Sequence, residues 1–171
     1  MYSLDLLKFL VSIGARKFIY PNNGTALAGR TTPFNVVVQN DADFLCLAVT
    51  MVFPTIDDDS GTVDNGVNLL SATFSDGASQ LPLSNDFVDL STIAAPGRQR
   101  YPGVSGDPSN ALNIPGYPWL HLYEGNGAIQ MQVANDSALD IPLKTSWDGY
   151  KVPFRFRDLV KGMLNPLGAQ A

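Results

Sequence analysis

Residues 34–53 read FNVVVQNDADFLCLAVTMVF, two apolar and β-branched runs joined by Asn40-Asp41-Ala42-Asp43. β-branched and aromatic residues are enriched in strands, whereas Asn and Asp are typical of turns. The stretch therefore predicts two consecutive strands, at 34–39 and 44–53, which form either an antiparallel hairpin or a corner between two sheets.

A similar pattern recurs later in the chain. Residues 128–134, AIQMQVA, alternate apolar and polar side chains, which predicts a half-buried strand. A turn at 135–137 leads into a second strand at 139–147, where Pro142 indicates an edge strand or a bulge. We interpret this pair as a hairpin that echoes the first one, Asn135-Asp136-Ser137 matching Asn40-Asp41-Ala42.

Further strands are predicted at 16–20, closed by a turn at 21–24, and at 67–74. Short strands separated by turn residues, with little helical periodicity, are typical of two packed sheets. The sequence therefore predicts an all-β fold, a β-sandwich of the jelly-roll type.

The domain organisation follows from where this pattern starts, stops and breaks. Residues 1–15 form an N-terminal arm or short helix, 16–152 the sandwich, and 153–171 a C-terminal arm or tail that includes a short helix. Within the sandwich, the Pro- and Gly-rich stretch 91–118 has no room for a regular element and predicts a long loop.

Charge is sparse in this chain. Only 16% of residues are charged, against about 25% in an average soluble protein, and the net charge is −5. No basic cluster is present, so we expect no nucleic-acid binding through phosphate contacts. Nor does any apolar segment reach the roughly 20 residues of a membrane span. The single cysteine, Cys46, lies in an apolar run and is predicted to be a buried hydrophobe.

Enzymatic chemistry has little support. The only histidine, His121, lies in the alternating stretch 119–123 without a Gly-x-Ser-x-Gly nucleophile motif, so we interpret it as a surface or inter-subunit strand residue. The acidic run at 57–59, with Asp64 nearby, lacks the alternating spacing of a calcium loop and indicates a solvated loop. We expect no catalysis, metal or cofactor.

Aromatic residues late in the chain leave a different function open. Aromatic rings stack on sugars, so a glycan- or receptor-binding module is the alternative, with Tyr117, Trp119 and Tyr123 as its binding candidates. Trp147 and Tyr150 belong to the same aromatic group. Aromatic side chains also dominate cores and protein interfaces, which is the more common role.

The ordered features between Phe34 and Val152 resemble the small jelly-roll proteins of tailed-bacteriophage heads, including decoration and cement proteins. Three features carry the resemblance: the early strand ending in Asn40-Asp41, the central stretch 81–90 (LPLSNDFVDL), and the late strand 129–137 leading to Trp147-Asp148-Gly149-Tyr150-Lys151.

The resemblance implies a non-enzymatic virion protein that is assembled in the host cytoplasm and cements the capsid surface. Its partners would be the major capsid protein and further copies of itself, with a trimer favoured; similar modules sit at the collar, tail or vertex. Arg and aromatic residues are enriched at interface anchors. We therefore expect the terminal segments and the loop 91–118 to reach neighbouring copies, with contacts at Arg98, Arg100, Tyr101, Phe154, Arg155, Phe156 and Arg157.

Overall fold

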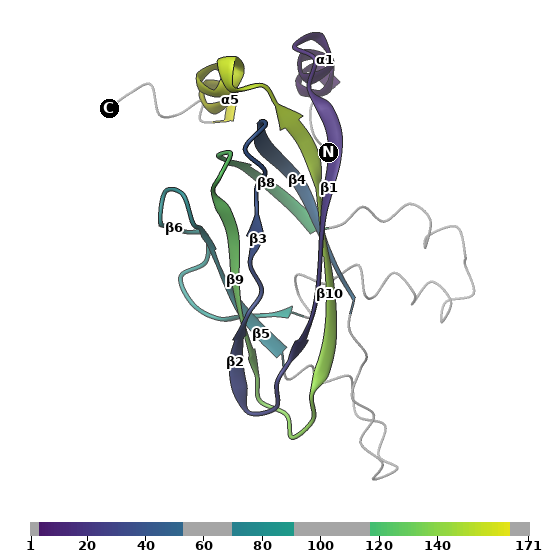
Figure 1. Ribbon diagram of the computed structural model, residues 1–171, viewed down its shortest axis with the longest axis vertical. Helices are drawn as coiled ribbons and strands as arrows, with labels where there is room; N and C mark the ends of the chain where they lie inside the picture. The colour runs from purple at the N-terminus through teal and green to yellow at the C-terminus, as the bar shows by residue number, and fades with distance from the viewer. Residues whose placement is uncertain (1–3, 53–69, 91–116, 165–171) are drawn as a thin grey trace, which may run out of the picture.

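The computed structural model describes residues 4–52, 70–90 and 117–164, and it confirms an all-β sandwich with short terminal helices (Figure 1). Two antiparallel sheets pack face to face. The β1 sheet has, in order, β1 (Arg16–Ala26), β10 (Ile141–Val152), β4 (Asp43–Val52) and β8 (Tyr117–Tyr123). The β9 sheet has β2 (Arg30–Pro33) and β3 (Val36–Val37) on β9 (Ala128–Asn135), followed by β5 (Leu70–Asp76), which pairs with β6 (Leu81–Pro82) and β7 (Val88–Asp89).

This strand order is that of a jelly roll. The short strands β2 and β3 can be taken as one broken strand, and so can β6 and β7. With this grouping, the chain forms four antiparallel pairs: β1 with β10, β2 and β3 with β9, β4 with β8, and β5 with β6 and β7. At the centre of one sheet β10 pairs with β4, and at the centre of the other β9 pairs with β5. A folded-over ribbon of two Greek keys produces this arrangement.

The inner faces of the two sheets form one core. On β9, the alternation predicted from the sequence is present, because Ile129, Met131 and Val133 are all buried. Cys46 is also fully buried, as expected, and burial raises the pKa of its thiol. The largest fully buried side chains are Trp147, Tyr123 and Phe44.

Residues 34–53 form a corner between the sheets, not a hairpin. β3 pairs with β9, whereas β4 pairs with β10 and β8. The second predicted hairpin was wrong for the same reason, since β9 and β10 lie in different sheets. Both β4 and β10 are central strands whose partners are distant in sequence, so burial of their apolar faces overrides local pairing. Pro142 opposes Thr25 of β1, and among the described residues it has a paired strand on that side alone, since the described part of β4 pairs with β10 only from Lys144 onward.

The predicted turn at 21–24 was also wrong, because these residues continue β1 to Ala26. Pro21 is tolerated there because β1 is an edge strand and pairs only with β10 in its sheet. Gly24 is required for packing: a Cβ atom at this position would lie 2.5 Å from the ring of Phe34.

A β-bulge at Leu47 shifts the alternation of β4. Phe44 and Cys46 face the core before it, and Val49 and Met51 face the core after it. The register with β10 shifts at the same place, between Asp148 and Gly149. β4 therefore has no single period-2 pattern along its length.

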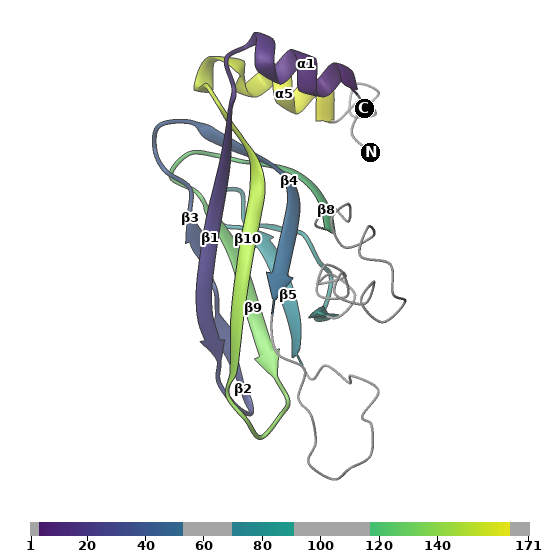
Figure 2. The same ribbon diagram turned by 90° about the vertical axis from the view of Figure 1, so that its right-hand side faces the viewer.

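The two helices lie together at one end of the sandwich (Figures 1 and 2). α1 (Leu4–Ser12) is followed closely by Gly14, whose φ of 73° is a common glycine conformation just after a helix. The turn η2 (Phe154–Phe156) leads into α5 (Arg157–Leu164). Neither helix of the described chain is long and apolar enough to cross a membrane.

Both terminal segments form short helices in their described parts and pack onto their own sheet. A second apolar cluster on the outer face of the β1 sheet joins the helices to β4, β8 and β10. Its buried members are Leu6, Leu10, Ile13, Leu45, Leu122, Val152 and Val160.

Substituting Gly149 should destabilise the sandwich strongly. An added Cβ atom would lie 2.0 Å from the carbonyl oxygen of Leu45, so the two central strands would have to move apart at the bulge. We expect Gly149→Ala to lower the free energy of unfolding by about 3 kcal/mol. The matched control is Gly162→Ala in α5, where the Cβ atom meets nothing within 4 Å; it should raise stability by up to about 1 kcal/mol. Urea denaturation of both variants measures the difference, and equal stabilities would contradict the packing argument.

Candidate functional site

The predicted contact residues near the C-terminus fall into two groups. Phe154 is 43% exposed, and Arg155 is exposed with its guanidinium over the ring of Phe156. Phe156 is partly buried in the second apolar cluster, and Arg157 forms ion pairs with two acidic side chains, so these two residues stabilise the molecule itself. The remaining predicted contacts, Arg98, Arg100 and Tyr101, lie outside the described residues.

The aromatic group proposed for glycan binding does not form a surface platform. Tyr123 has no exposure, burial raises its pKa, and its hydroxyl accepts a hydrogen bond from Nε1 of Trp119 (2.9 Å). The ring centroids of Trp119 and buried Trp147 lie 5.6 Å apart. Tyr150 is partly buried against the second apolar cluster, and the side chain of Tyr117 is not among those that the structure describes. The glycan assignment of Tyr123 was therefore wrong, because the inner face of β8 is turned into the core.

A buried carboxylate anchors the helical end. Asp43, at the start of β4, has no solvent exposure. It accepts hydrogen bonds from Nε and Nη2 of Arg157, each at 2.7 Å, and from the backbone N–H of Gly125 at 2.9 Å. The hydrogen bonds between Arg157 and Asp43 raise the pKa of Arg157 above its usual value, although burial of the guanidinium opposes part of this effect. The bidentate geometry fixes both the position and the orientation of α5.

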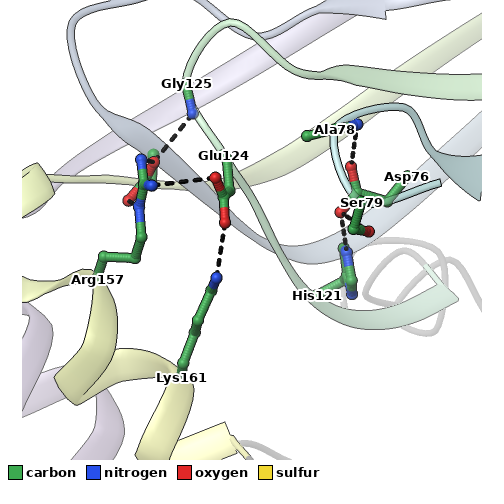
Figure 3. Close-up of polar contacts among 9 residues, drawn as sticks. Asp76, Ala78, Ser79, His121, Glu124, Gly125, Arg157 and Lys161 are labelled. Carbon is green, nitrogen blue, oxygen red and sulfur yellow. Dashed lines mark hydrogen bonds and ion pairs between the residues drawn. The ribbon is translucent and has the colours of Figure 1, made fainter. Parts of the chain in front are cut away.

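Glu124 extends this network toward the surface (Figure 3). One of its carboxylate oxygens lies 3.0 Å from Nη1 of Arg157, and the other accepts a hydrogen bond from Nζ of Lys161 at 2.6 Å. Two basic residues of α5 are thus matched by two acidic residues at the ends of β4 and β8.

A second polar cluster joins the two sheets. Asp76 ends β5 with its side chain only 4% exposed, and its Oδ2 lies 3.2 Å from Nε2 of His121 on β8. The same carboxylate accepts hydrogen bonds from Ser79 Oγ (2.8 Å) and the N–H of Ala78 (2.9 Å). Burial alone would raise the pKa of Asp76, but the hydrogen bonds outweigh it and its pKa lies below the usual value. His121 is partly exposed, with 21% of its side chain accessible, and it also bonds to Asp76 across the sandwich; its expected role between subunits stays a prediction.

The polar cluster of Asp76, Ser79 and His121 differs from a nucleophilic triad in its hydrogen bonds. A triad needs the hydroxyl to donate to the imidazole and the imidazole to be oriented by the carboxylate. Here the Ser79 hydroxyl donates to Asp76 directly, and His121 binds the same oxygen of that carboxylate. The arrangement orients a turn and holds two sheets together, and it does not activate Ser79.

A cleft of about 380 Å³ separates the two polar clusters. Figure 3 shows Glu124 and Lys161 on one side and the Asp76 cluster on the other. Its lining is mainly apolar and includes Leu81, Leu122 and Leu164. The volume lies in the range of small-molecule or side-chain pockets. This cleft is the candidate binding site of the described chain.

The acidic side chains of the described segments (4–52, 70–90 and 117–164) do not gather into a metal site: no group of three or more His, Cys, Asp or Glu residues could hold an ion there. The acidic run 57–59 with Asp64 lies outside these segments. No protein-family model, curated protein or solved structure matches the chain.

Sequence reasoning missed the pairings that build the site. Asp43 and Arg157 are 114 positions apart, and Asp76 and His121 are 45 apart. Asp43 did appear in the Asn-Asp turn motif, and Arg157 among the contact candidates. What the sequence lacked was their pairing, which depends on strand order.

Removing Arg157 should be costly because it leaves the Asp43 charge buried without a cation. We expect Arg157→Met to lower the free energy of unfolding by about 3 kcal/mol. The matched control is Lys161→Met on the same helix, which removes the ion pair with Glu124. The Lys161 side chain is 48% exposed, so the loss in free energy of unfolding should stay below about 1 kcal/mol. Denaturant titration measures both, and similar costs would contradict a special role for the buried pair.

Asp76 should stabilise the fold only above acidic pH. Its folded-state pKa is lowered, so its contribution is fully present above the unfolded value of about 3.9 and is lost as the pH falls through the lower folded value. The stability difference between wild type and Asp76→Asn should therefore shrink as the pH falls below about 5. Asp136→Asn, which alters an exposed carboxylate, serves as the control. An unchanged difference for Asp76→Asn would show that its hydrogen bonds do not favour the ionised form.

Proposed function

We propose that this chain is a non-enzymatic structural protein of a tailed-phage virion that decorates or cements the capsid through protein–protein contacts. The observation that carries the proposal is the jelly-roll strand order. Jelly rolls recur in viral capsid proteins and lectins. The lectin alternative is weakened because Trp147 and Tyr123 are core residues and Trp119 packs against them.

The helical end supplies a surface suited to a protein partner. Phe154, Leu159 and Met163 are 43%, 53% and 42% exposed. Leu159 and Met163 are four residues apart on α5 and therefore share one side of the helix. Arg155 adds an exposed guanidinium beside them. Aromatic residues, methionine and arginine are enriched at protein interfaces.

A rigid contact surface fits a cementing role. The helices that carry these residues are already docked by the Arg157 ion pairs and by the second apolar cluster. Binding then requires little further ordering, so less of the contact energy is lost. Many copies repeating one weak contact would give large collective stabilisation of a shell.

The copy number in purified virions tests this proposal. Quantitative mass spectrometry should find the chain at a stoichiometry near that of the major capsid protein. A few copies per particle would contradict the decoration role and favour the alternative location at a vertex, collar or tail. Absence from the particles would overturn the virion assignment altogether.

The contact surface has a separate test. Arg155→Glu should release the protein from particles at lower salt than wild type, because it reverses an exposed charge at the proposed interface. Arg30→Glu, an exposed arginine at the start of β2, is the matched control. Co-sedimentation with particles across a salt series measures release, and equal release of both variants would place the contact elsewhere.

A further inference from the structure

We propose that residues 165–171, which follow α5 in the sequence, fold back over the cleft of their own chain and place Leu167 among Leu81, Leu122 and Leu164. These seven residues lie outside the part of the chain that the structure describes. The proposal concerns what covers the cleft, so it goes beyond the proposed function and does not depend on the virion assignment.

The cleft presents apolar surface that no described segment covers. Leu81 is 49% exposed and Leu164 is only partly buried, so water contacts part of the apolar lining. The volume of about 380 Å³ is large enough for a leucine side chain with its adjoining backbone. An apolar side chain placed there would be stabilised by removing this surface from water.

The charged groups of the cleft favour an uncharged occupant. Asp76 already takes part in three polar contacts within the chain. Glu124 already forms ion pairs with Arg157 and Lys161. An acidic segment would face these two carboxylates, and a basic segment would compete with the cations that already pair with Glu124. An uncharged segment meets neither cost.

Composition and position single out residues 165–171. They read NPLGAQA and contain no charged side chain, whereas the segments 53–69 and 91–116, which also lie outside the described residues, both carry charges. Residue 165 directly follows Leu164, which lines the cleft. None of the other segments outside the described residues adjoins a described lining residue in the sequence.

A short connection favours the chain's own segment over that of a neighbour. Asn165 and Pro166 separate Leu164 from Leu167, and three residue steps of extended chain reach about 10 Å. Pro166 has a fixed φ and disfavours helical backbone at the residue before it, which agrees with the end of α5 at Leu164. Folding back therefore costs little conformational freedom, and the short tether gives an effective concentration in the millimolar range.

A covered cleft leaves the proposed contact surface free. Phe154, Leu159 and Met163 are not among the residues that line the cleft. Residues 165–171 therefore hide apolar surface at Leu81 and Leu164 without blocking these three side chains. Any other molecule that enters the cleft must first displace Leu167.

Methyl NMR of the purified full-length protein tests this contact. Wild type should show nuclear Overhauser effects between the methyl groups of Leu167 and those of Leu81 or Leu122. Leu167→Asp and a chain that stops after Leu164 should shift the methyl signals of Leu81 and Leu122 in the same direction. The matched control is Leu167→Met, which keeps an apolar side chain and should leave these signals close to wild type. Absence of the Overhauser effects, or signals that Leu167→Asp leaves unchanged, would overturn the proposal.

Two further measurements separate the chain's own segment from other occupants. The peptide NPLGAQA, at about millimolar concentration, should restore the wild-type signals in the chain that stops after Leu164 and should not change those of wild type. The wild-type signals should also be independent of protein concentration. Signals that approach those of Leu167→Asp on dilution would show that the segment fills a neighbour's cleft. A peptide that shifts wild type as much as the shortened chain would show that the cleft is open, and either result would contradict docking within one chain.

Discussion

The helical end of this molecule depends on the pairing of one carboxylate, Asp43, which has no contact with solvent. A buried ion pair contributes little net stability, because the desolvation cost offsets the attraction, but its geometry selects one arrangement over others. Here the two hydrogen bonds from Arg157 orient α5. That orientation brings Lys161 to Glu124 and places Leu164 on the wall of the cleft. The pair therefore helps, together with the second apolar cluster, to set the position of the α5 side of the cleft.

Two other polar residues do similar work where strands end inside the sandwich. Asp76 bonds to His121 across the gap between the sheets, and Asn135 bonds to Ala26 at the opposite end. Each side chain faces a partner on a distant segment, and an unpaired polar group there would be costly. A jelly roll moves its chain from sheet to sheet at nearly every turn, so polar bonds at these ends help to specify which strands lie side by side.

The sequence predicted what depends on local pattern. The alternation of β9 was visible because that strand has one core face and one more exposed face. The pairing partners of β4 and β10 were not predictable, because alternation shows which face of a strand is buried and not which strands lie beside it. Leu47 could not be recognised as a bulge, because the register shift that defines it is measured against Asp148 and Gly149, about a hundred residues away. The Asn-Asp motifs correctly marked places where the chain changes direction, but a turn motif does not tell a hairpin from a corner.

The same limit separates the fold from the site. Trp119, His121 and Tyr123 do share one face of β8, as alternation predicts, yet the identity of that face decides their role. Turned outward, the aromatic rings would form a sugar platform; turned inward, they complete the core and leave one imidazole to bridge the sheets. Only the position of β8 at the edge of the β1 sheet, opposite β5, selects the second outcome. The inner face of β8 therefore belongs to the core, so alternation in the sequence identified a strand face correctly without showing what that face contacts.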